Sequence, residues 1–202
     1  MHILRSIGWL ISLVLSTIPC YWLLVHPRAE YWRSKPGARF RVLGPLWVAM
    51  WIAAGLVTRP WRHVLLYDAA WTWIPAASFV VIGFFLYSRA HLSFDQLIGR
   101  PEVQGEGHAQ RLVTTGVHSR VRHPVYLGHL CELIGWSIAT GLVVIYALTA
   151  FAVLTGAVMI RAEESELERR FGEAYCKYKR RVPAVIPRFA ASAPELQSDA
   201  HG

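Results

Sequence analysis

Two polar stretches in the second half of the chain carry residues suited to binding ions. The first runs from Leu112 to Gly128 and contains Arg122, His123 and Pro124. Because proline suits the first turn of a helix, Arg122 and His123 lie at a predicted helix entrance, beside backbone N–H groups that lack intrahelical partners. Such an entrance binds anions. The plainer alternative is a basic collar that anchors the helix among lipid headgroups.

The second stretch runs from Arg161 to Pro187 and has two adjacent carboxylates directly after an apolar run. Glu163 and Glu164 lie at the same predicted membrane depth as the first stretch. Carboxylates at this depth require a cationic partner. That partner is Arg161, Arg122 or the ammonium group of a ligand.

The rest of the second stretch has the pattern of an amphipathic helix. Its apolar and aromatic residues recur at helical spacing, and prolines end it: Leu167, Phe171, Tyr175, Tyr178, Pro183 and Pro187. The pattern predicts a helix that lies on the bundle or on the membrane surface. Three further carboxylates are interpreted as its solvated face: Glu166, Glu168 and Glu173.

Two ionisable residues, His129 and Glu132, interrupt an apolar run. A spacing of three places them on one face of a helix, where they form a hydrogen bond with each other or line the path of a substrate.

Five apolar runs position these groups. They are Ile7–Val25, Val42–Thr58, Tyr67–Tyr87, Tyr126–Thr140 and Leu142–Ile160. The composition agrees with membrane spans, because 54% of the 202 residues are hydrophobic and only 17% are charged, against about 25% charged in soluble domains. The first run lacks the cleavage site of a signal peptide. The fourth run is short, which favours a tilted, buried or partly re-entrant helix. The predicted fold is an all-α membrane bundle of about five spans with a C-terminal amphipathic helix on the cytoplasmic face.

The distribution of lysine and arginine over the loops predicts the orientation of this bundle. Five lie in the loop after the first run, five in the loop after the third and eight after the fifth, which makes 18 of the 21. The positive-inside rule then places the N-terminus outside and the C-terminus in the cytoplasm. The same rule accounts for the net charge of +8 without a nucleic-acid partner. We expect three regions: a membrane region (1–87), a catalytic region (88–188) and a disordered tail (189–202). The three cysteines have neither disulfide nor zinc spacing, so no metal site is expected.

Together the two stretches resemble the isoprenylcysteine carboxyl methyltransferase family of integral membrane enzymes, and more loosely the phospholipid N-methyltransferases. The matching residues of the first stretch are Leu112-Val113-Thr114-Thr115-Gly116-Val117 and Arg122-His123-Pro124-Val125-Tyr126 with Gly128. Those of the second are Glu163-Glu164, Leu167, Phe171-Gly172, Tyr175, Tyr178, Val182-Pro183 and Ile186-Pro187. The two sets occur in order, separated by a hairpin of two apolar runs.

The resemblance implies S-adenosylmethionine as cofactor, bound between the hairpin and the C-terminal helix. It places these residues around the cofactor: Gln110, Arg111, Leu112, Val113, His118, His123, Pro124, Val125, Tyr126 and Glu163. The chemistry of the residues agrees. The cofactor's carboxylate suits Arg122, His123 or backbone N–H groups, and its ammonium suits Glu163 or Glu164. Its adenine suits an apolar wall, for which Tyr126, Phe171 and Tyr175 are candidates. The absence of a Gly-x-Gly-x-x-Gly motif after a strand excludes a Rossmann-type methyltransferase.

In the expected reaction, a lipophilic acceptor from the bilayer attacks the methyl group on the cofactor's sulfonium sulfur and displaces that sulfur. The acceptor is a small molecule or a prenylated molecule, and a carboxylate is the first candidate for its attacking group. The catalytic candidates are Arg122, Glu164 and Glu132. A carboxylate acceptor is already ionised at neutral pH, whereas an amine must lose a proton to Glu132 or Glu164. The resemblance also implies an arginine for the acceptor's carboxylate at position 159, where this chain has Met159. The alternatives are a phospholipid or amine N-methyltransferase, an NADPH-dependent enzyme similar to sterol reductases, and a non-catalytic membrane scaffold.

Overall fold

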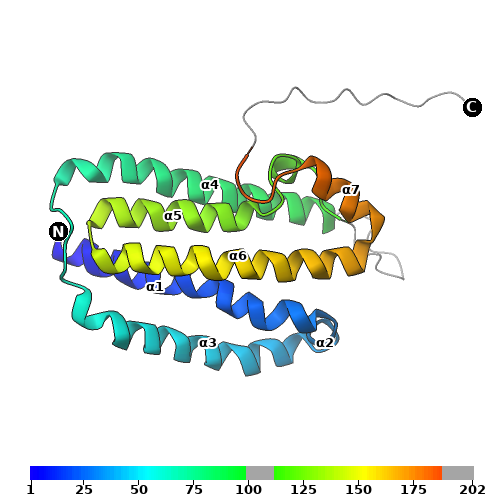
Figure 1. Ribbon diagram of the computed structural model, residues 1–202, viewed down its shortest axis with the longest axis horizontal. Coiled ribbons are helices and arrows are strands. Elements are labelled where there is room, and N and C mark those ends of the chain that lie inside the picture. Colours follow the sequence, from blue (N-terminus) through cyan, green and yellow to red (C-terminus); the bar gives the residue numbers. More distant parts are fainter. Residues whose placement is uncertain (99–111, 188–202) are drawn as a thin grey trace, which may run out of the picture.

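The computed structural model describes residues 1–98 and 112–187, and these residues form long helices that lie side by side, without strands (Figure 1). The helices are α1 (His2–Val25), α2 (Ala29–Ser34), α3 (Pro36–Thr58), α4 (Trp73–Ile98), α5 (Pro124–Thr140), α6 (Val143–Phe171) and α7 (Glu173–Arg181). Short 3-10 helices connect them: η1 (His26–Arg28), η2 (Arg59–Trp61), η3 (Ala70–Thr72) and η5 (Gly116–Ser119). The predicted all-α membrane bundle is confirmed. Gln110, Arg111 and the predicted tail lie outside the described residues.

Four helical stretches of the described chain are long and apolar enough to cross a membrane. They are His2–Ser34, Gly37–Trp61, Ala70–Leu92 and Val143–Phe171. The predicted fourth span is α5, which has only 17 residues and so falls short of the roughly 20 that a bilayer core requires. It lies between α4 and α6, while α1 packs on the other side of α6 and α3 packs on α1 (Figure 1).

Glycines bring α4 and α5 into close contact. A Cβ atom added to Gly83 would lie 2.6 Å from the carbonyl oxygen of Gly128, and one added to Gly128 would lie 2.8 Å from that of Gly83. Small residues allow membrane helices to approach in this way without a hydrophobic driving force between them. The contact fixes the register of α5, whose N-terminus carries Arg122 and His123.

The helix boundaries differ from the prediction, most of all at the end of the last span. The apolar run expected to end at Ile160 continues as helix to Phe171, so the two adjacent carboxylates belong to α6 itself. The predicted single amphipathic helix is therefore the end of α6 plus α7. Gly172 separates them with a φ of +54°, a conformation that glycine adopts without the strain of a side chain.

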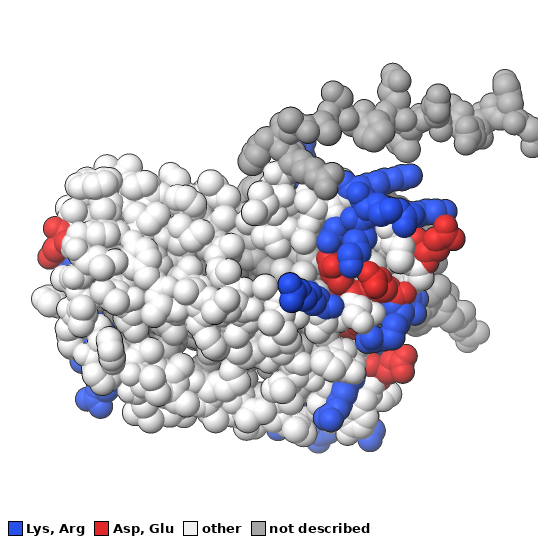
Figure 2. Space-filling view, in the orientation of Figure 1, with Lys and Arg blue, Asp and Glu red and all other residues white. Residues whose placement is uncertain are grey.

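The two ends of the bundle differ in charge. Figure 2 shows most of the visible Lys, Arg, Asp and Glu residues gathered at the end that carries α7, and a smaller group at the opposite end. At that opposite end Arg5 binds Asp68, with 2.6 Å between Nη2 and Oδ1, and donates from Nε to the carbonyl oxygen of Thr140 at 3.2 Å. On the face that Figure 2 shows, a band almost without charged residues lies between the ends, as expected for a membrane-embedded bundle.

Candidate active site

A cavity of about 370 Å³ lies at the α7 end of the bundle, within the roughly 300–1,000 Å³ that is usual for small-molecule sites. Residues from α1, η1, α4, η5, α5 and α6 line it: Ile18, Trp22, His26, Ala90, His91, His118, Arg122, His123, Pro124, Val125, Tyr126, His129 and Glu163. The structure therefore brings together six of the predicted cofactor-binding residues, namely His118, His123, Pro124, Val125, Tyr126 and Glu163. Leu112 and Val113 are partly buried and do not line the cavity.

Glu163 presents a buried oxygen to this cavity. Its Oε2 lies 3.2 Å from Nδ1 of His123, but the arrangement lacks hydrogen-bond geometry, so Oε2 has no hydrogen-bond partner among the described residues. A buried acceptor without a partner is costly unless a ligand or water supplies a donor. The position suits the ammonium group of a ligand.

Glu164 faces α7 instead, because consecutive residues of a helix differ by about 100° in direction. Its Oε1 accepts a hydrogen bond from Nε of Arg122 at 2.9 Å and lies 3.3 Å from Nε2 of His123, and its Oε2 lies 2.9 Å from Nζ of Lys179. Three cationic side chains thus surround this carboxylate, which is not part of the cavity wall. The two adjacent glutamates have different surroundings.

Arg122 fastens the start of α5 to the chain that follows α7. It donates two hydrogen bonds to Glu164 and two more from Nη1, to the carbonyl oxygens of Lys179 (2.9 Å) and Val182. These four bonds leave one of its five N–H groups. The backbone N–H groups of Arg122 and His123 donate to the carbonyl oxygens of Pro183 and Ala184, each at 2.9 Å. Arg122 lines the cavity, but four of its five N–H groups hold the start of α5 against α6 and the end of α7.

His123 lies between the two carboxylates, with only 3% of its side chain exposed. Burial alone would lower its pKa, but the close contacts with the Glu163 and Glu164 carboxylates and their negative charges outweigh burial and raise the pKa above the usual 6.5. The raised pKa favours the imidazolium form, in which one ring N–H faces each carboxylate. The ring fixes the Glu163 side chain at the cavity.

The first turn of α5 adds backbone donors to the same wall. Pro124 occupies its first position, and no side chain caps the helix. The N–H groups of Val125 and Tyr126 precede the first possible intrahelical acceptor, so they lack helical partners. They lie beside a ring that is positively charged, which makes this wall a site for an anionic group such as a carboxylate.

His118 contributes a neutral ring. Burial, helped by the nearby charge of His123 and opposed by Glu163, lowers the pKa of His118, and its Nδ1 is buried without a partner within residues 1–98 and 112–187. Its carbonyl oxygen accepts a hydrogen bond from the Tyr178 hydroxyl at 2.6 Å. Burial raises the pKa of Tyr178 to about 12, so this hydroxyl keeps its proton.

The predicted His129–Glu132 hydrogen bond is wrong. His129 lines the cavity, and its buried Nδ1 has no partner among the residues described. Glu132 packs against Gly83 and does not reach the cavity wall. Both side chains contact α4 instead: the ring centroid of His129 lies 5.7 Å from that of Tyr87, and Glu132 lies at Gly83.

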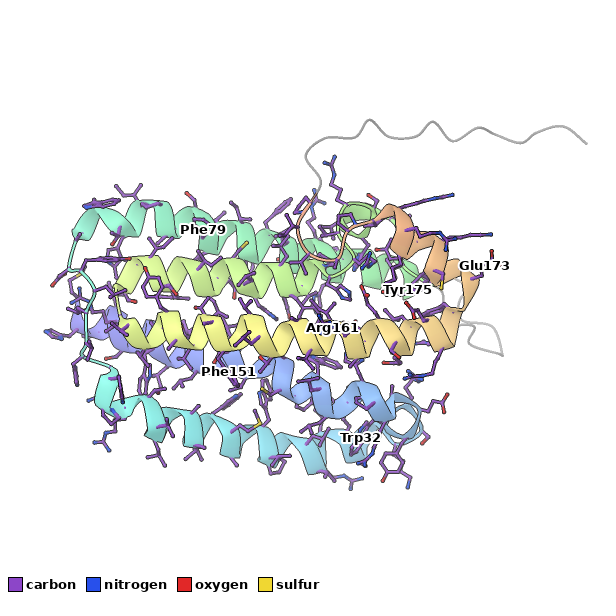
Figure 3. All side chains as sticks on the ribbon, in the orientation of Figure 1. Trp32, Phe79, Phe151, Arg161, Glu173 and Tyr175 are labelled. Carbon is purple, nitrogen blue, oxygen red and sulfur yellow. The ribbon has the colours of Figure 1, made fainter. Side chains whose placement is uncertain are left out.

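The structure corrects several expectations for the C-terminal segment. Glu166, predicted to be solvated, is buried, with 2.7 Å between its Oε2 and Nδ1 of His26, and it also binds Arg33. Arg161 is exposed on α6 (Figure 3), whereas Met159 is completely buried. Arg161 therefore does not replace, at the cavity, the cation missing at position 159. Phe171 and Tyr175 do not line the cavity either.

The cavity residues of the N-terminal half were not predicted from the sequence. Ile18 and Trp22 of α1, His26 of η1, and Ala90 and His91 of α4 form much of the wall. No short motif marks them. The one available signal was that His26 follows the first apolar run at the same membrane depth as Glu163.

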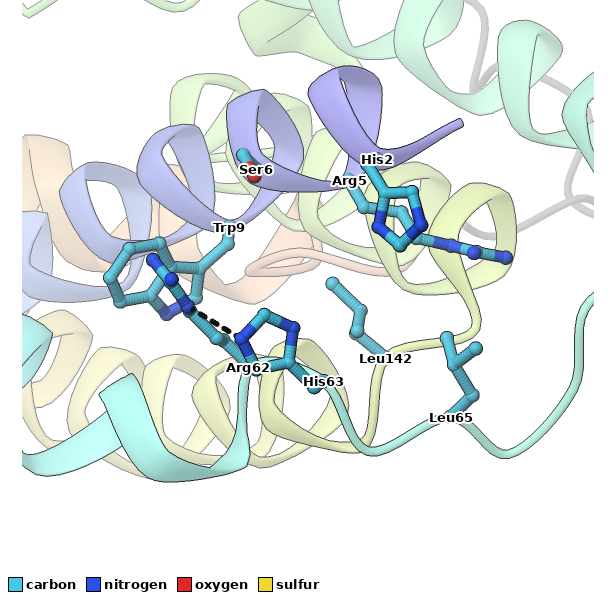
Figure 4. A pocket seen from close by; sticks show the side chains of 8 residues that line it. All are labelled: His2, Arg5, Ser6, Trp9, Arg62, His63, Leu65 and Leu142. Atoms are coloured by element: carbon cyan, nitrogen blue, oxygen red, sulfur yellow. Dashed lines mark hydrogen bonds between the residues drawn. The ribbon is translucent and has the colours of Figure 1, made fainter.

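A smaller hollow of about 100 Å³ lies at the opposite end of the bundle (Figure 4). It is lined by His2, Arg5, Ser6, Trp9, Arg62, His63, Leu65 and Leu142. Nε of Arg62 donates to Nε2 of His63 at 3.0 Å. This hollow contains none of the predicted site residues, and the cavity beside Glu163 is the candidate active site.

An all-α membrane bundle with such a cavity at its charged end defines a membrane-embedded small-molecule site. The model of the phospholipid methyltransferase family matches residues 71–174, about half of the chain and most of the cavity wall. The chain belongs to this family. The predicted resemblance to isoprenylcysteine carboxyl methyltransferases is confirmed by the relatives.

Three relatives show the range of the similarity. Protein-S-isoprenylcysteine O-methyltransferase B of Arabidopsis thaliana is 37% identical over 100 residues, which are 47% of each chain. Nickel-cobalt-cadmium resistance protein NccN of Alcaligenes xylosoxydans xylosoxydans is 40% identical over 81 residues, 39% of this chain and 37% of the relative. Methanethiol S-methyltransferase 1 of Bradyrhizobium diazoefficiens is 30% identical over 120 residues, 59% of this chain and 39% of the relative. The chain spans about half or less of the length of these curated relatives. Two of their names state the methylated atom, oxygen in one and sulfur in the other, and the third names a resistance to metals.

Proposed function

We propose that the protein transfers the methyl group of S-adenosylmethionine to a lipophilic acceptor, with a carboxylate such as that of a prenylated cysteine as the first candidate. The observation that carries the proposal is the buried Oε2 of Glu163, which has an ion-pair contact with His123 but no hydrogen bond among the described residues. It belongs to the same cavity wall as Val125 and Tyr126, whose N–H groups lack helical partners. This wall offers an acceptor for an ammonium and donors for a carboxylate, which are the two ends of the cofactor's amino-acid part.

The residues present fit the cofactor in three places. Glu163 would hold its ammonium, and the first turn of α5 beside the charged His123 would hold its carboxylate. Tyr126 offers an aromatic surface for the adenine. Bound there, the cofactor supplies an electrophilic methyl group on a positively charged sulfur.

The protein's part in the reaction is alignment and exclusion of water. A carboxylate acceptor has an ordinary pKa of about 4 and needs no base at neutral pH. Holding its oxygen in line with the methyl group removes much of the entropic barrier, and a dry site removes the hydration shell of the anion. Glu164 and Arg122 support this geometry through His123 and the start of α5.

We also propose the topology that the charge distribution favours, with the N-terminus outside and the C-terminus and cavity on the cytoplasmic side. A water-soluble cofactor then enters from the cytoplasm, and the acceptor enters from the bilayer. Residues 88–188 form the catalytic region in this proposal. The wall formed by Ile18, Trp22 and His26 gives the region before residue 88 a share in the site.

A methyl-transfer assay with three acceptors tests the proposal. Purified protein in detergent is incubated with S-adenosylmethionine labelled in its methyl group and with N-acetyl-S-farnesylcysteine, dioleoylphosphatidylethanolamine or decanethiol. We expect label in the first product as a methyl ester, which alkali releases as methanol. If only the amine or only the thiol became labelled, that compound class would take the place of the carboxylate as the proposed acceptor. No label in any of the three compounds, together with no cofactor binding, would contradict the proposal.

A further inference from the structure

His26 carries an unused ring nitrogen in the cavity wall. The residue follows α1 in η1 and is 8% exposed. Its Nδ1 lies 2.7 Å from Oε2 of Glu166, and Arg33 binds the other oxygen of the same carboxylate. Its Nε2 is buried and has no hydrogen-bond partner in the part of the chain that the structure describes.

The surroundings of His26 fix its orientation. A carboxylate only accepts hydrogen bonds, so the contact with Glu166 places a proton on Nδ1 and leaves Nε2 as the group available to a ligand. Trp22 stacks on the ring, with 5.4 Å between the ring centroids and 26° between the planes. A histidine in a cavity wall with a carboxylate on one ring nitrogen and no partner on the other has the usual arrangement of a histidine that acts on a ligand.

The position of His26 points to the acceptor rather than to the cofactor. Glu163 and the first turn of α5 already match the two charged ends of the cofactor. His26 belongs to the part of the wall that comes from α1, together with Ile18 and Trp22, whose apolar surfaces suit a lipid chain. Met159 supplies no charge there, and Arg161 is exposed.

We infer that Nε2 of His26, held in place by Glu166, donates the hydrogen bond that binds the carboxylate of the methyl acceptor. The inference rests on the proposed function. Donation from Nε2 while Nδ1 is bound to Glu166 requires a proton on each ring nitrogen. Both ring nitrogens then donate, one to Glu166 and one to the acceptor.

Binding of a carboxylate probe to the cofactor-loaded protein tests the inference without turnover. S-adenosylhomocysteine, at saturation, occupies the cofactor site, and N-acetyl-S-farnesylcysteine is titrated into the detergent-purified protein by calorimetry. We expect His26→Leu to weaken binding of the probe by about tenfold or more, the range of a hydrogen bond to a charged group. His26→Gln, which keeps an N–H donor but no charge, should lose less.

Two controls separate acceptor binding from folding. The methyl ester of the same probe has no charge to bind, so it should bind wild type and His26→Leu equally. Glu168→Gln changes an exposed-face carboxylate on α6 that binds Lys179, and it should leave the affinity for both probes unchanged. Affinity for S-adenosylhomocysteine should stay the same in every variant, which shows that the fold is intact.

Unchanged affinity of His26→Leu for the carboxylate probe, or an equal loss for the ester, would overturn the inference. A parallel loss of S-adenosylhomocysteine binding, with normal binding by His26→Gln, would do the same by assigning the ring to the cofactor site. If wild type binds no S-adenosylhomocysteine, the proposed function fails. If it binds S-adenosylhomocysteine but not the carboxylate probe, methyl transfer from this cofactor stands, and the inference fails together with the carboxylate as first candidate acceptor.

Discussion

His123 makes the stability of the site depend on pH. Its pKa is raised in the folded protein, because Glu163 and Glu164 outweigh the effect of burial. A group whose pKa is raised by folding stabilises the folded state. This contribution to the free energy of unfolding is complete at pH values below the unfolded-state pKa of about 6.5, and it is lost as the pH rises through the folded-state pKa. We therefore expect the thermal midpoint of the detergent-purified protein to fall as pH rises from about 6 through this raised pKa.

The matched variant for this prediction is His123→Gln, which cannot carry the charge. Its thermal midpoint should be lower than that of wild type at acidic pH, and the difference should shrink as pH rises. A difference that is constant over the same range would show that His123 is not held as an imidazolium.

Arg122 should matter for stability as well as for the site. Its side chain is 9% exposed and that of Glu164 is 10% exposed, and removal of one partner from a buried pair costs about 3–5 kcal/mol. We expect Arg122→Leu to lower the thermal midpoint sharply and to weaken cofactor binding, since the start of α5 loses its attachment. Thermal unfolding followed by tryptophan fluorescence measures the first effect.

Lys177→Ala is the control for Arg122→Leu. Lys177 forms an exposed pair with Glu173, 3.2 Å apart, on α7, and exposed pairs contribute little. An equal loss of stability in the two variants would mean that the Arg122 network has no special role.

The residue types of the site were predictable from the sequence, but the partners were not. Arg122, His123, Glu163 and Glu164 stood out because ionisable groups are rare at that depth. Which glutamate faces the cavity depends on how α6 is rotated against α7. Glu166 was misjudged for the same reason, because its partner His26 lies 140 positions earlier in the chain and no local pattern connects them.

At the scale of elements, the contact between α4 and α5 is the most sensitive. Gly128→Ala would place a methyl group 2.8 Å from the carbonyl oxygen of Gly83, too close for the helices to keep their positions. Overpacking of this kind costs about 1–3 kcal/mol. We expect a lower thermal midpoint and a displaced cavity, measured by thermal unfolding and by cofactor affinity.

The matched control is Gly44→Ala on α3, where an added Cβ meets nothing within 4 Å. This change should be neutral or slightly stabilising, because alanine favours a helix over glycine. If the two alanine variants behaved alike, the close packing of α4 on α5 would not be what positions the site.

Hydrophobic runs predicted the existence of the long helices well and their ends poorly. Hydropathy marks where a span leaves the apolar layer. A helix continues beyond that point as long as its backbone N–H and C=O groups keep their hydrogen-bond partners. α6 therefore extends to Phe171, past the predicted end at Ile160. It ends at Gly172, a stop signal that the sequence contained.

At the scale of the whole molecule, the uneven charge predicts one orientation in the membrane. Fusions in a bacterial host measure it, with green fluorescent protein, which fluoresces in the cytoplasm, and alkaline phosphatase, which is active outside it. We expect a C-terminal fluorescent protein to fluoresce and a C-terminal phosphatase to be inactive. The reverse result would place the cavity on the outer face and would contradict cofactor entry from the cytoplasm.

The predicted catalytic region begins at residue 88 and so does not include the first helix. Ile18, Trp22 and His26 complete the cavity, although they precede the matched family region by more than forty positions. Sequence comparison did not reveal this contribution, because the similarity to the family begins at residue 71.

The central claim is that the cavity beside Glu163 binds S-adenosylmethionine, and the most direct test is calorimetry with S-adenosylhomocysteine on the detergent-purified protein, with NADPH in parallel. We expect saturable binding of S-adenosylhomocysteine alone, and loss of at least about tenfold in affinity in Glu163→Ala, since a buried charged hydrogen bond disappears. Binding of NADPH alone would favour a reductase, and binding of neither compound by folded protein would favour a non-catalytic scaffold. Either result, or an unchanged affinity in Glu163→Ala, would contradict the assignment of this site.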